Sequence, residues 1–128
     1  MAANTHLENL KAICKQIGDA LALEIDKSNG DELTGKLGVL TTLLPTSSHA
    51  VALANMLYSE RFMQLTEDNQ YKNLSATDKK MIFAGKARNE GYYVDLTNRL
   101  NSSLVHGIDA LRSTLSYLKQ GMSVAQMR

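Results

Sequence analysis

A cluster of lysines around one phenylalanine is the part of the sequence whose residue types come nearest to a binding chemistry. At 100° per residue along a helix, Lys79, Phe83 and Lys86 lie within about 60° of one another, with Lys80 and Arg88 close by. Nucleobases stack on aromatic rings and lysines contact phosphates, so an exposed Phe83 predicts a contact for single-stranded nucleic acid or a small nucleotide. The alternative, which we prefer, is a solvated face whose Phe83 is buried by a neighbouring helix.

A second motif, in residues 30–36, satisfies the G-x-x-x-x-G-K pattern of phosphate-binding loops. Such a loop follows a β-strand, and the next residue is a Ser or Thr that helps to hold magnesium. Here a predicted helix precedes the segment, Leu37 follows it, and the carboxylates of Asp31 and Glu32 would repel a phosphate. The segment is therefore interpreted as a turn between two helices.

The residues that could bind a metal ion or act as nucleophiles are far apart in the sequence. His6, His49, His106 and Cys14 show none of the short spacings that are typical of metal ligands. Cys14 occupies an apolar position of a predicted helix, where cysteine behaves as a small buried hydrophobe. The sequence thus predicts no catalytic residue, no metal site and no cofactor, and a protein that is not an enzyme.

The composition is that of one globular domain built from helices. The chain has 128 residues, of which 44% are hydrophobic and 21% are charged, and it contains one proline and no tryptophan. Leu, Ala, Met, Lys and Gln lose little on entering a helix, while the aromatic residues that strands favour are few. These properties predict an all-α fold and a single helical domain over residues 1–128.

Cysteine usage and the N-terminal sequence predict a cytoplasmic protein without a membrane segment. A lone cysteine cannot form an intrachain disulfide, which fits a reducing compartment. Residues 1–6 have neither the basic nor the apolar region of a signal peptide. The longest apolar run, residues 50–54, is much shorter than the roughly 20 residues that cross a bilayer.

The net charge of +1 hides an uneven distribution along the chain. Residues 1–35 carry three basic and six acidic side chains, whereas residues 75–128 carry eight basic and four acidic ones. The two halves can pair within the chain or between subunits, or the basic half can meet an anion. Pairing within the chain is the simplest of the three interpretations.

Periodicity and capping residues predict a bundle of four to five helices. These are expected at about residues 5–28, 31–43, 48–65, 75–90 and 92–120. Thr5 and Ser75 are expected N-caps, and Pro45 is expected to end the second helix because the residue before a proline leaves the helical region. Gly91 is the expected site of a kink or a break, and Gly121 is an expected C-cap.

The longest apolar stripe lies in the C-terminal third of the chain. It advances by about 3.6 residues per step, the period of a straight α-helix. Its members are Tyr93, Leu96, Leu100, Leu104, Ile108, Leu111, Leu115 and Leu118. A helix unbroken at Gly91 would be about 65 Å long, against roughly 30 Å for a globule of this size. The stripe therefore predicts self-association, whereas a break at Gly91 would favour a monomer.

Together these features predict a non-enzymatic helical interaction or assembly module. It is expected to form a homo-oligomer and to bind another macromolecule, with a protein as the expected partner. The alternative function is binding of single-stranded nucleic acid or a small nucleotide by the basic face that begins near Ser75. In size and helix content the chain is similar to small accessory proteins of phages and mobile elements, including oligomeric recombination mediators, although it matches no motif of theirs.

Overall fold

The computed structural model describes the backbone of residues 2–127 and the side chains of residues 5–121. All regular structure in this part of the chain is helical, which confirms the predicted all-α fold with a long C-terminal helix. The elements, in chain order, are α1 (Ala2–Ala22), α2 (Gly30–Glu67), the short 3-10 helix η1 (Asn69–Tyr71), α3 (Ala76–Lys86) and α4 (Arg88–Met127).

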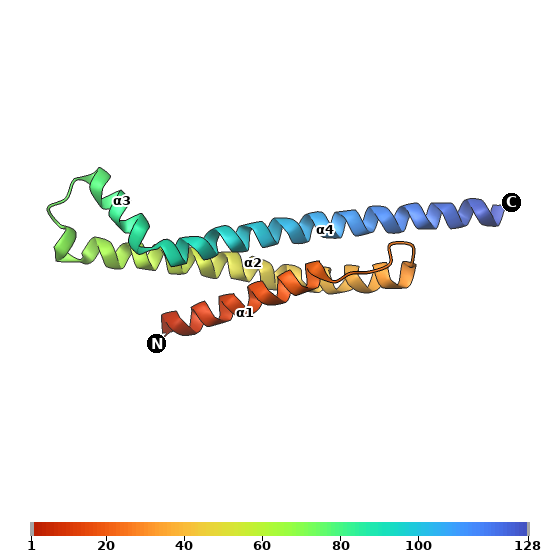
Figure 1. The fold of residues 1–128 in the computed structure, drawn as a ribbon, viewed down its shortest axis with the longest axis horizontal. Coiled ribbons are helices and arrows are strands. Elements are labelled where there is room, and N and C mark those ends of the chain that lie inside the picture. Colours follow the sequence, from red (N-terminus) through yellow and green to blue (C-terminus); the bar gives the residue numbers. More distant parts are fainter. Residues whose placement is uncertain (1, 128) are drawn as a thin grey trace.

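Three of these helices lie side by side in an elongated bundle (Figure 1). α2 and α4 form a long antiparallel pair, and α1 packs against both of them. The register of the pair follows from facing residues, which are Tyr58 with Gly91, Ser47 with Asn101, and Leu40 with Gly107. The two residue numbers in each pair add to between 147 and 149, so Gly30 at the start of α2 faces a point near residue 118 of α4.

The core follows the line along which α1, α2 and α4 meet. One buried cluster consists of Leu10, Cys14, Ala50, Leu53, Ala54, Leu57 and Tyr93. The next consists of Ile17, Leu40, Leu43, Leu104 and Ile108. The predicted core position of Cys14 is confirmed, and burial raises the pKa of its thiol.

The expectation that Pro45 ends a helix is wrong, because α2 continues through it from Gly30 to Glu67. Proline has no N–H, so the carbonyl of Thr41, four residues earlier, loses its helical hydrogen bond. Pro45 and Thr41 both lie on the exposed side of α2, where water can bond that carbonyl. On the opposite side Leu43 and Ser47 are buried in the bundle, and this packing holds the helix together across the proline.

The predicted first helix is displaced at both ends. Thr5 lies inside α1, which already begins at Ala2, and the helix ends at Ala22 rather than near residue 28. The ammonium group of Lys36, on α2, donates hydrogen bonds to the carbonyl oxygens of Leu21 (3.0 Å) and Leu23 (2.7 Å). Because a cation that bonds the last carbonyls ends a helix, the sequence of α1 alone did not reveal where it stops.

The segment 30–36 is helical, as expected from its context rather than from its phosphate-loop pattern. Asn29 caps α2, since its side-chain oxygen accepts hydrogen bonds from the N–H groups of Asp31 (3.0 Å) and Glu32 (3.2 Å). The two carboxylates lie in the first turn of α2, where the helix dipole favours negative charge. Lys36 is engaged with the end of α1, as described above.

The break expected at Gly91 occurs at Ala87, four residues earlier. Ala87 is fully buried and has φ −98° and ψ 20°, outside the helical region, so that α3 and α4 change direction there. Gly91 instead lies inside α4, where a Cβ atom would be 3.3 Å from Cε2 of the Tyr58 ring. The glycine thus permits a close approach of two helices. Gly121 also lies inside α4 and is not its C-cap.

A short aromatic cluster closes the end of the bundle opposite the C-terminus. Ser75 caps α3 as predicted, accepting a hydrogen bond of 3.1 Å from the N–H of Asp78. Phe83 of α3 meets Phe62 of α2 and Tyr71 of η1 edge to face, with ring centroids 6.0 and 5.5 Å away. Edge-to-face packing suits aromatic rings because a positive edge meets a negative face.

The central helix also meets the simplest requirements for crossing a membrane. α2 contains an 18-residue window with a mean hydropathy of 1.3 and has the necessary length, although no single apolar run in it is long. Core helices of soluble bundles meet the same requirements. In this fold α2 is the helix against which both α1 and α4 pack.

Candidate interaction site

The predicted self-association stripe on α4 divides into a covered part and an uncovered part. Tyr93, Leu104 and Ile108 are buried within the chain, and Leu96 and Leu100 pack against the same clusters. For these five residues the expected interface is wrong, because α1 and α2 cover them. Leu111, Leu115 and Leu118 are only half-buried.

The lengths of the neighbouring helices explain why the stripe becomes uncovered. α1 ends at Ala22, and its Leu21 side chain lies 3.5 Å from where a Cβ atom of Gly107 would be. α2 begins at Gly30, which faces α4 near residue 118 according to the register of the pair. Residues 108–118 of α4 therefore have α2 on one side and no helix in the place of α1. Residues 119–127 extend beyond both neighbours, as the right-hand side of Figure 1 shows.

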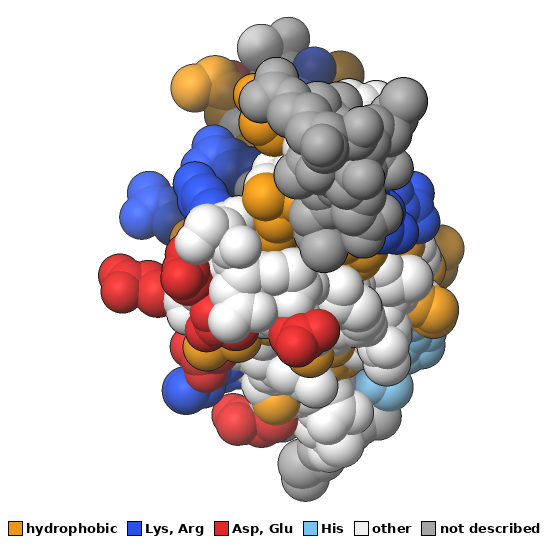
Figure 2. All heavy atoms as spheres, turned by 90° about the vertical axis from the view of Figure 1, so that its right-hand side faces the viewer, with side chains coloured by type: hydrophobic (Ala, Val, Ile, Leu, Met, Phe, Trp, Pro, Cys, Tyr) orange, Lys and Arg blue, Asp and Glu red, His pale blue; other side chains and the backbone are white. Residues whose placement is uncertain are grey.

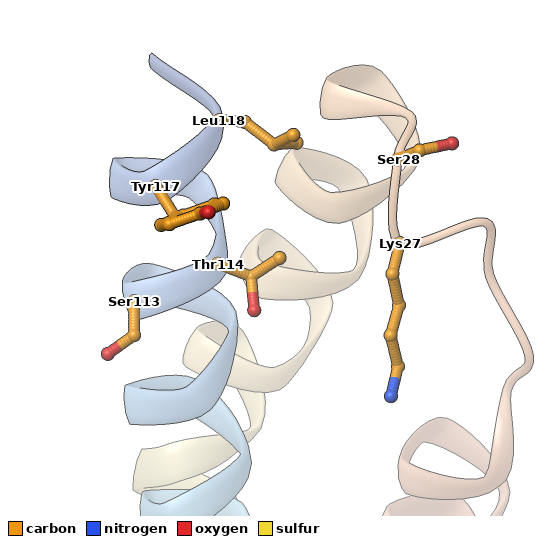
Figure 3. Close-up of a pocket in the computed structure, with 6 residues that line it drawn as sticks. All are labelled: Lys27, Ser28, Ser113, Thr114, Tyr117 and Leu118. Carbon is orange, nitrogen blue, oxygen red and sulfur yellow. The ribbon is translucent and has the colours of Figure 1, made fainter. Parts of the chain in front are cut away.

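A groove lies where α1 would continue if it were longer. Its volume is about 530 Å³, and it is lined by Lys27, Ser28, Ser113, Thr114, Tyr117 and Leu118. Figure 3 shows Thr114 and Leu118 on α4 facing across the groove toward the α1–α2 connection, while the Lys27 side chain extends along the opposite wall. The Tyr117 side chain is 77% exposed, although tyrosine carries a large apolar ring. We call residues 108–118 of α4 with this groove the distal strip.

The connection beside the distal strip is acidic. Residues 23–32 contain Glu24, Asp26, Asp31 and Glu32 against the single cation Lys27. Asp26 accepts hydrogen bonds from the N–H (2.9 Å) and the hydroxyl (2.6 Å) of Ser28, and these bonds lower the pKa of its carboxyl group. Figure 2 views this end of the molecule and shows acidic and apolar side chains exposed together on it.

The basic face predicted around Phe83 is only partly present. Phe83 is 5% exposed and packs in the aromatic cluster, so the expectation of an exposed ring for base stacking is wrong, and the preferred alternative of burial by a neighbouring helix is confirmed. Lys80, Lys86 and Arg88 are exposed and Lys79 is half-buried. Within the part of the chain that the structure describes, none of these four cations forms an ion pair.

Two other hollows occur on the surface. One, of about 530 Å³, lies between α1 and α2 above the small residues Gly35 and Gly38. The other, of about 430 Å³, is lined by Tyr58, Arg88, Gly91, Tyr92, Val94 and Asp95. Each presents ordinary surface side chains, and neither holds a buried charged group. The distal strip differs from both because a whole neighbouring helix is missing beside it.

The residues considered for metal or nucleophilic chemistry remain apart in space. Among the described side chains, no group of three His, Cys, Asp or Glu residues is placed to hold a metal ion. His49 and His106 are exposed and His6 is half-buried, while Cys14 faces the core. The structure therefore brings no predicted chemical residues together at a common site.

Sequence reasoning found the α4 side of the distal strip but missed the opposite wall. Leu111, Leu115 and Leu118 belong to the predicted stripe, whereas Lys27 and Ser28 had no signal of their own because only the fold places them next to α4. No family model, curated protein or solved structure matches this chain.

Proposed function

We propose that this chain is a non-enzymatic helical interaction module that self-associates through the distal strip and binds another macromolecule. One observation carries the proposal: the apolar stripe of α4 continues through Leu111, Leu115 and Leu118 after α1 has ended. In the middle of the molecule the same stripe is a buried core, so the sequence spends leucines on a surface that its own fold leaves half-open.

The free energy available at this surface favours a protein partner. Complete burial of a leucine side chain contributes about 1.5–3 kcal/mol relative to full exposure, so covering three half-buried leucines contributes roughly half of that at each. Tyr117 adds a ring that is 77% exposed, and tyrosine is enriched in protein interfaces because it combines an apolar body with a polar tip. These contributions are large enough to support association in the micromolar range.

Light scattering of the purified protein at micromolar concentration tests the proposal. We expect a mass above that of the 14.1 kDa monomer, and a shift toward the monomer in Leu118→Glu, because a carboxylate in the distal strip cannot be covered without losing its water. Val105→Glu is the matched control, since Val105 is 43% exposed and lies on the same helix outside the groove. A strictly monomeric wild-type mass would refute self-association.

A second candidate for the macromolecule is single-stranded nucleic acid, with Lys79, Lys80, Lys86 and Arg88 as the contacts. The observation in its favour is that these cations form no ion pair with the described residues and so remain available to phosphates. Burial of Phe83 removes the stacking ring, which leaves an electrostatic contact that should weaken steeply with salt.

Fluorescence anisotropy with a labelled single-stranded oligonucleotide tests this second candidate. We expect binding at low salt that is lost in the Lys79→Glu, Lys86→Glu double variant, while Lys11→Glu, Lys15→Glu serves as a control with the same change in net charge on α1. Absence of binding by the wild-type protein at low salt would remove nucleic acid as a partner.

A further inference from the structure

The part of α4 that lacks a neighbour and the part that extends beyond the bundle have matching lengths. The distal strip begins after Gly107, where α1 ends, and reaches residue 118, where α2 begins. Beyond it, residues 119–127 continue as helix without a partner in the chain. At 1.5 Å per residue the strip is about 16 Å long and the overhang about 13 Å. One such overhang would fill one such strip.

From this match we propose that the occupant of the distal strip is the C-terminal end of α4 from a second copy of the chain. The inference rests on the proposed self-association and specifies its geometry. The two α4 helices run antiparallel about a twofold axis near Leu118, so that residues 119–127 of each copy lie along residues 109–117 of the other. Facing residues then have numbers that add to about 236, and each copy supplies the helix that is missing from the other.

The sequence at this end has the spacing that such a pair requires. Positions 111, 115, 118, 122 and 125 are Leu, Leu, Leu, Met and Ala, separated by alternate steps of four and three residues. This spacing is the one with which helices pack along a continuous seam. It is centred on Leu118, so that reversing the direction of the helix about this residue places apolar positions opposite apolar positions.

The charges of the two surfaces are complementary. After Asp109 the sequence of α4 contains the cations Arg112, Lys119 and Arg128 and no acidic residue. The α1–α2 connection beside the groove contains four carboxylates and one lysine in residues 23–32. A cationic helix end from a second copy is therefore drawn to the acidic border of the groove, with Lys27 as the one like charge that it meets.

This geometry is an isologous interface, in which the same surface of both copies is used and association stops at two. An apolar peptide or a second protein would fill the groove without the numerical match between strip and overhang. A parallel pair of α4 helices would leave both grooves empty. The three arrangements place different residues opposite one another and can be separated by cross-linking.

Cysteine cross-linking in a Cys14→Ser background tests the inference. We expect Leu118→Cys to form a covalent dimer by itself, because each copy presents this residue at the axis. Leu115→Cys and Gly121→Cys should cross-link with each other when mixed, and each much less when alone, because their numbers add to 236. Val105→Cys, exposed on α4 outside the groove, is the control that reports random collision.

The outcomes separate this inference from the proposed function. Efficient self-linking of Leu115→Cys would indicate parallel helices and overturn the inference. A dimer by light scattering with no cross-link at any of the three positions would show that another surface is used, so that the inference fails while self-association stands. A monomeric wild-type protein at micromolar concentration would overturn both.

A charge substitution gives an independent measurement. Lys119→Glu should weaken the dimer by roughly threefold in Kd, as is typical for the loss of an exposed complementary charge. Lys80→Glu makes the same change in net charge at α3, near the other end of the molecule, and should leave the Kd unchanged. Equal effects of the two substitutions would contradict the proposed position of the overhang.

Discussion

The middle and the end of α4 have the same apolar periodicity and different surroundings. In the middle, Leu104 is fully buried between α1 and α2, whereas near the end Leu118 borders an open groove. Nothing in the local sequence distinguishes the two leucines, because each follows the previous apolar position at helical spacing. The comparison teaches that the lengths of neighbouring helices decide whether a stripe becomes core or interface.

The largest expected effect comes from truncating the two leucines. Leu104→Ala should lower the free energy of unfolding by about 2–5 kcal/mol, because it leaves a cavity in a buried cluster. Leu118→Ala should lower it by less than about 1 kcal/mol in the dilute monomer, because its side chain is already half-exposed. Urea unfolding at a concentration below the dimer Kd makes the measurement. Equal losses would mean that the end of α4 is as well covered as the middle.

The next largest effect concerns the proline that the covered part of the bundle tolerates. Pro45→Ala should stabilise the protein by about 1–3 kcal/mol, because alanine restores the N–H that bonds the Thr41 carbonyl and removes the steric conflict of the ring. Thermal and urea unfolding of the variant measure the gain. A loss of stability would show instead that the bundle requires a bend of α2 at this residue.

A smaller effect distinguishes a glycine in a close helix contact from one on a free surface. Gly38→Ala should stabilise the protein by about 0.5–1 kcal/mol, since alanine favours helix and no atom lies within 4 Å of the new Cβ. Gly91→Ala should gain about 1 kcal/mol less, because its Cβ would press on the Tyr58 ring at 3.3 Å. Identical gains in chemical unfolding would show that the α2–α4 contact yields easily.

The smallest expected effect is a pH dependence at the border of the groove. Hydrogen bonds from Ser28 lower the pKa of Asp26 from its ordinary value of 3.8, so the turn is stabilised above that pH and loses the contribution as the pH falls through the lowered pKa. In Ser28→Ala the pKa of Asp26 should return toward 3.8, as an NMR titration of the carboxyl group would show. An unchanged pKa would mean that Ser28 does not hold the turn.

Much of the fold could be predicted from the sequence, and the exceptions have physical causes. Helical propensity and periodicity predicted the all-α fold, the cap at Ser75 and the buried Cys14. Pro45 misled because the cost of an absent N–H falls on the solvent side of α2, while the packing that offsets it comes from residues distant in sequence.

The candidate site was less predictable than the fold. Phe83 looked available between two lysines, and only the position of η1 and α2 shows that its ring is covered by Tyr71 and Phe62. The stripe on α4 was found, but its division between core and surface depends on where α1 stops. That point is determined by a contact between helices, which no pattern within α1 encodes.

The contact in question gives one ammonium group control over how much adhesive surface the molecule displays. α1 has no glycine in a left-handed conformation at its end, and no described residue has a positive φ. Its termination instead depends on Lys36, whose side chain occupies the last carbonyl oxygens. If that ammonium were neutralised or shortened, Leu23 and its neighbours would be free to add a helical turn, and α1 would grow over the leucines of α4. The reach of one side chain thus sets the boundary between the interior of this protein and its exterior.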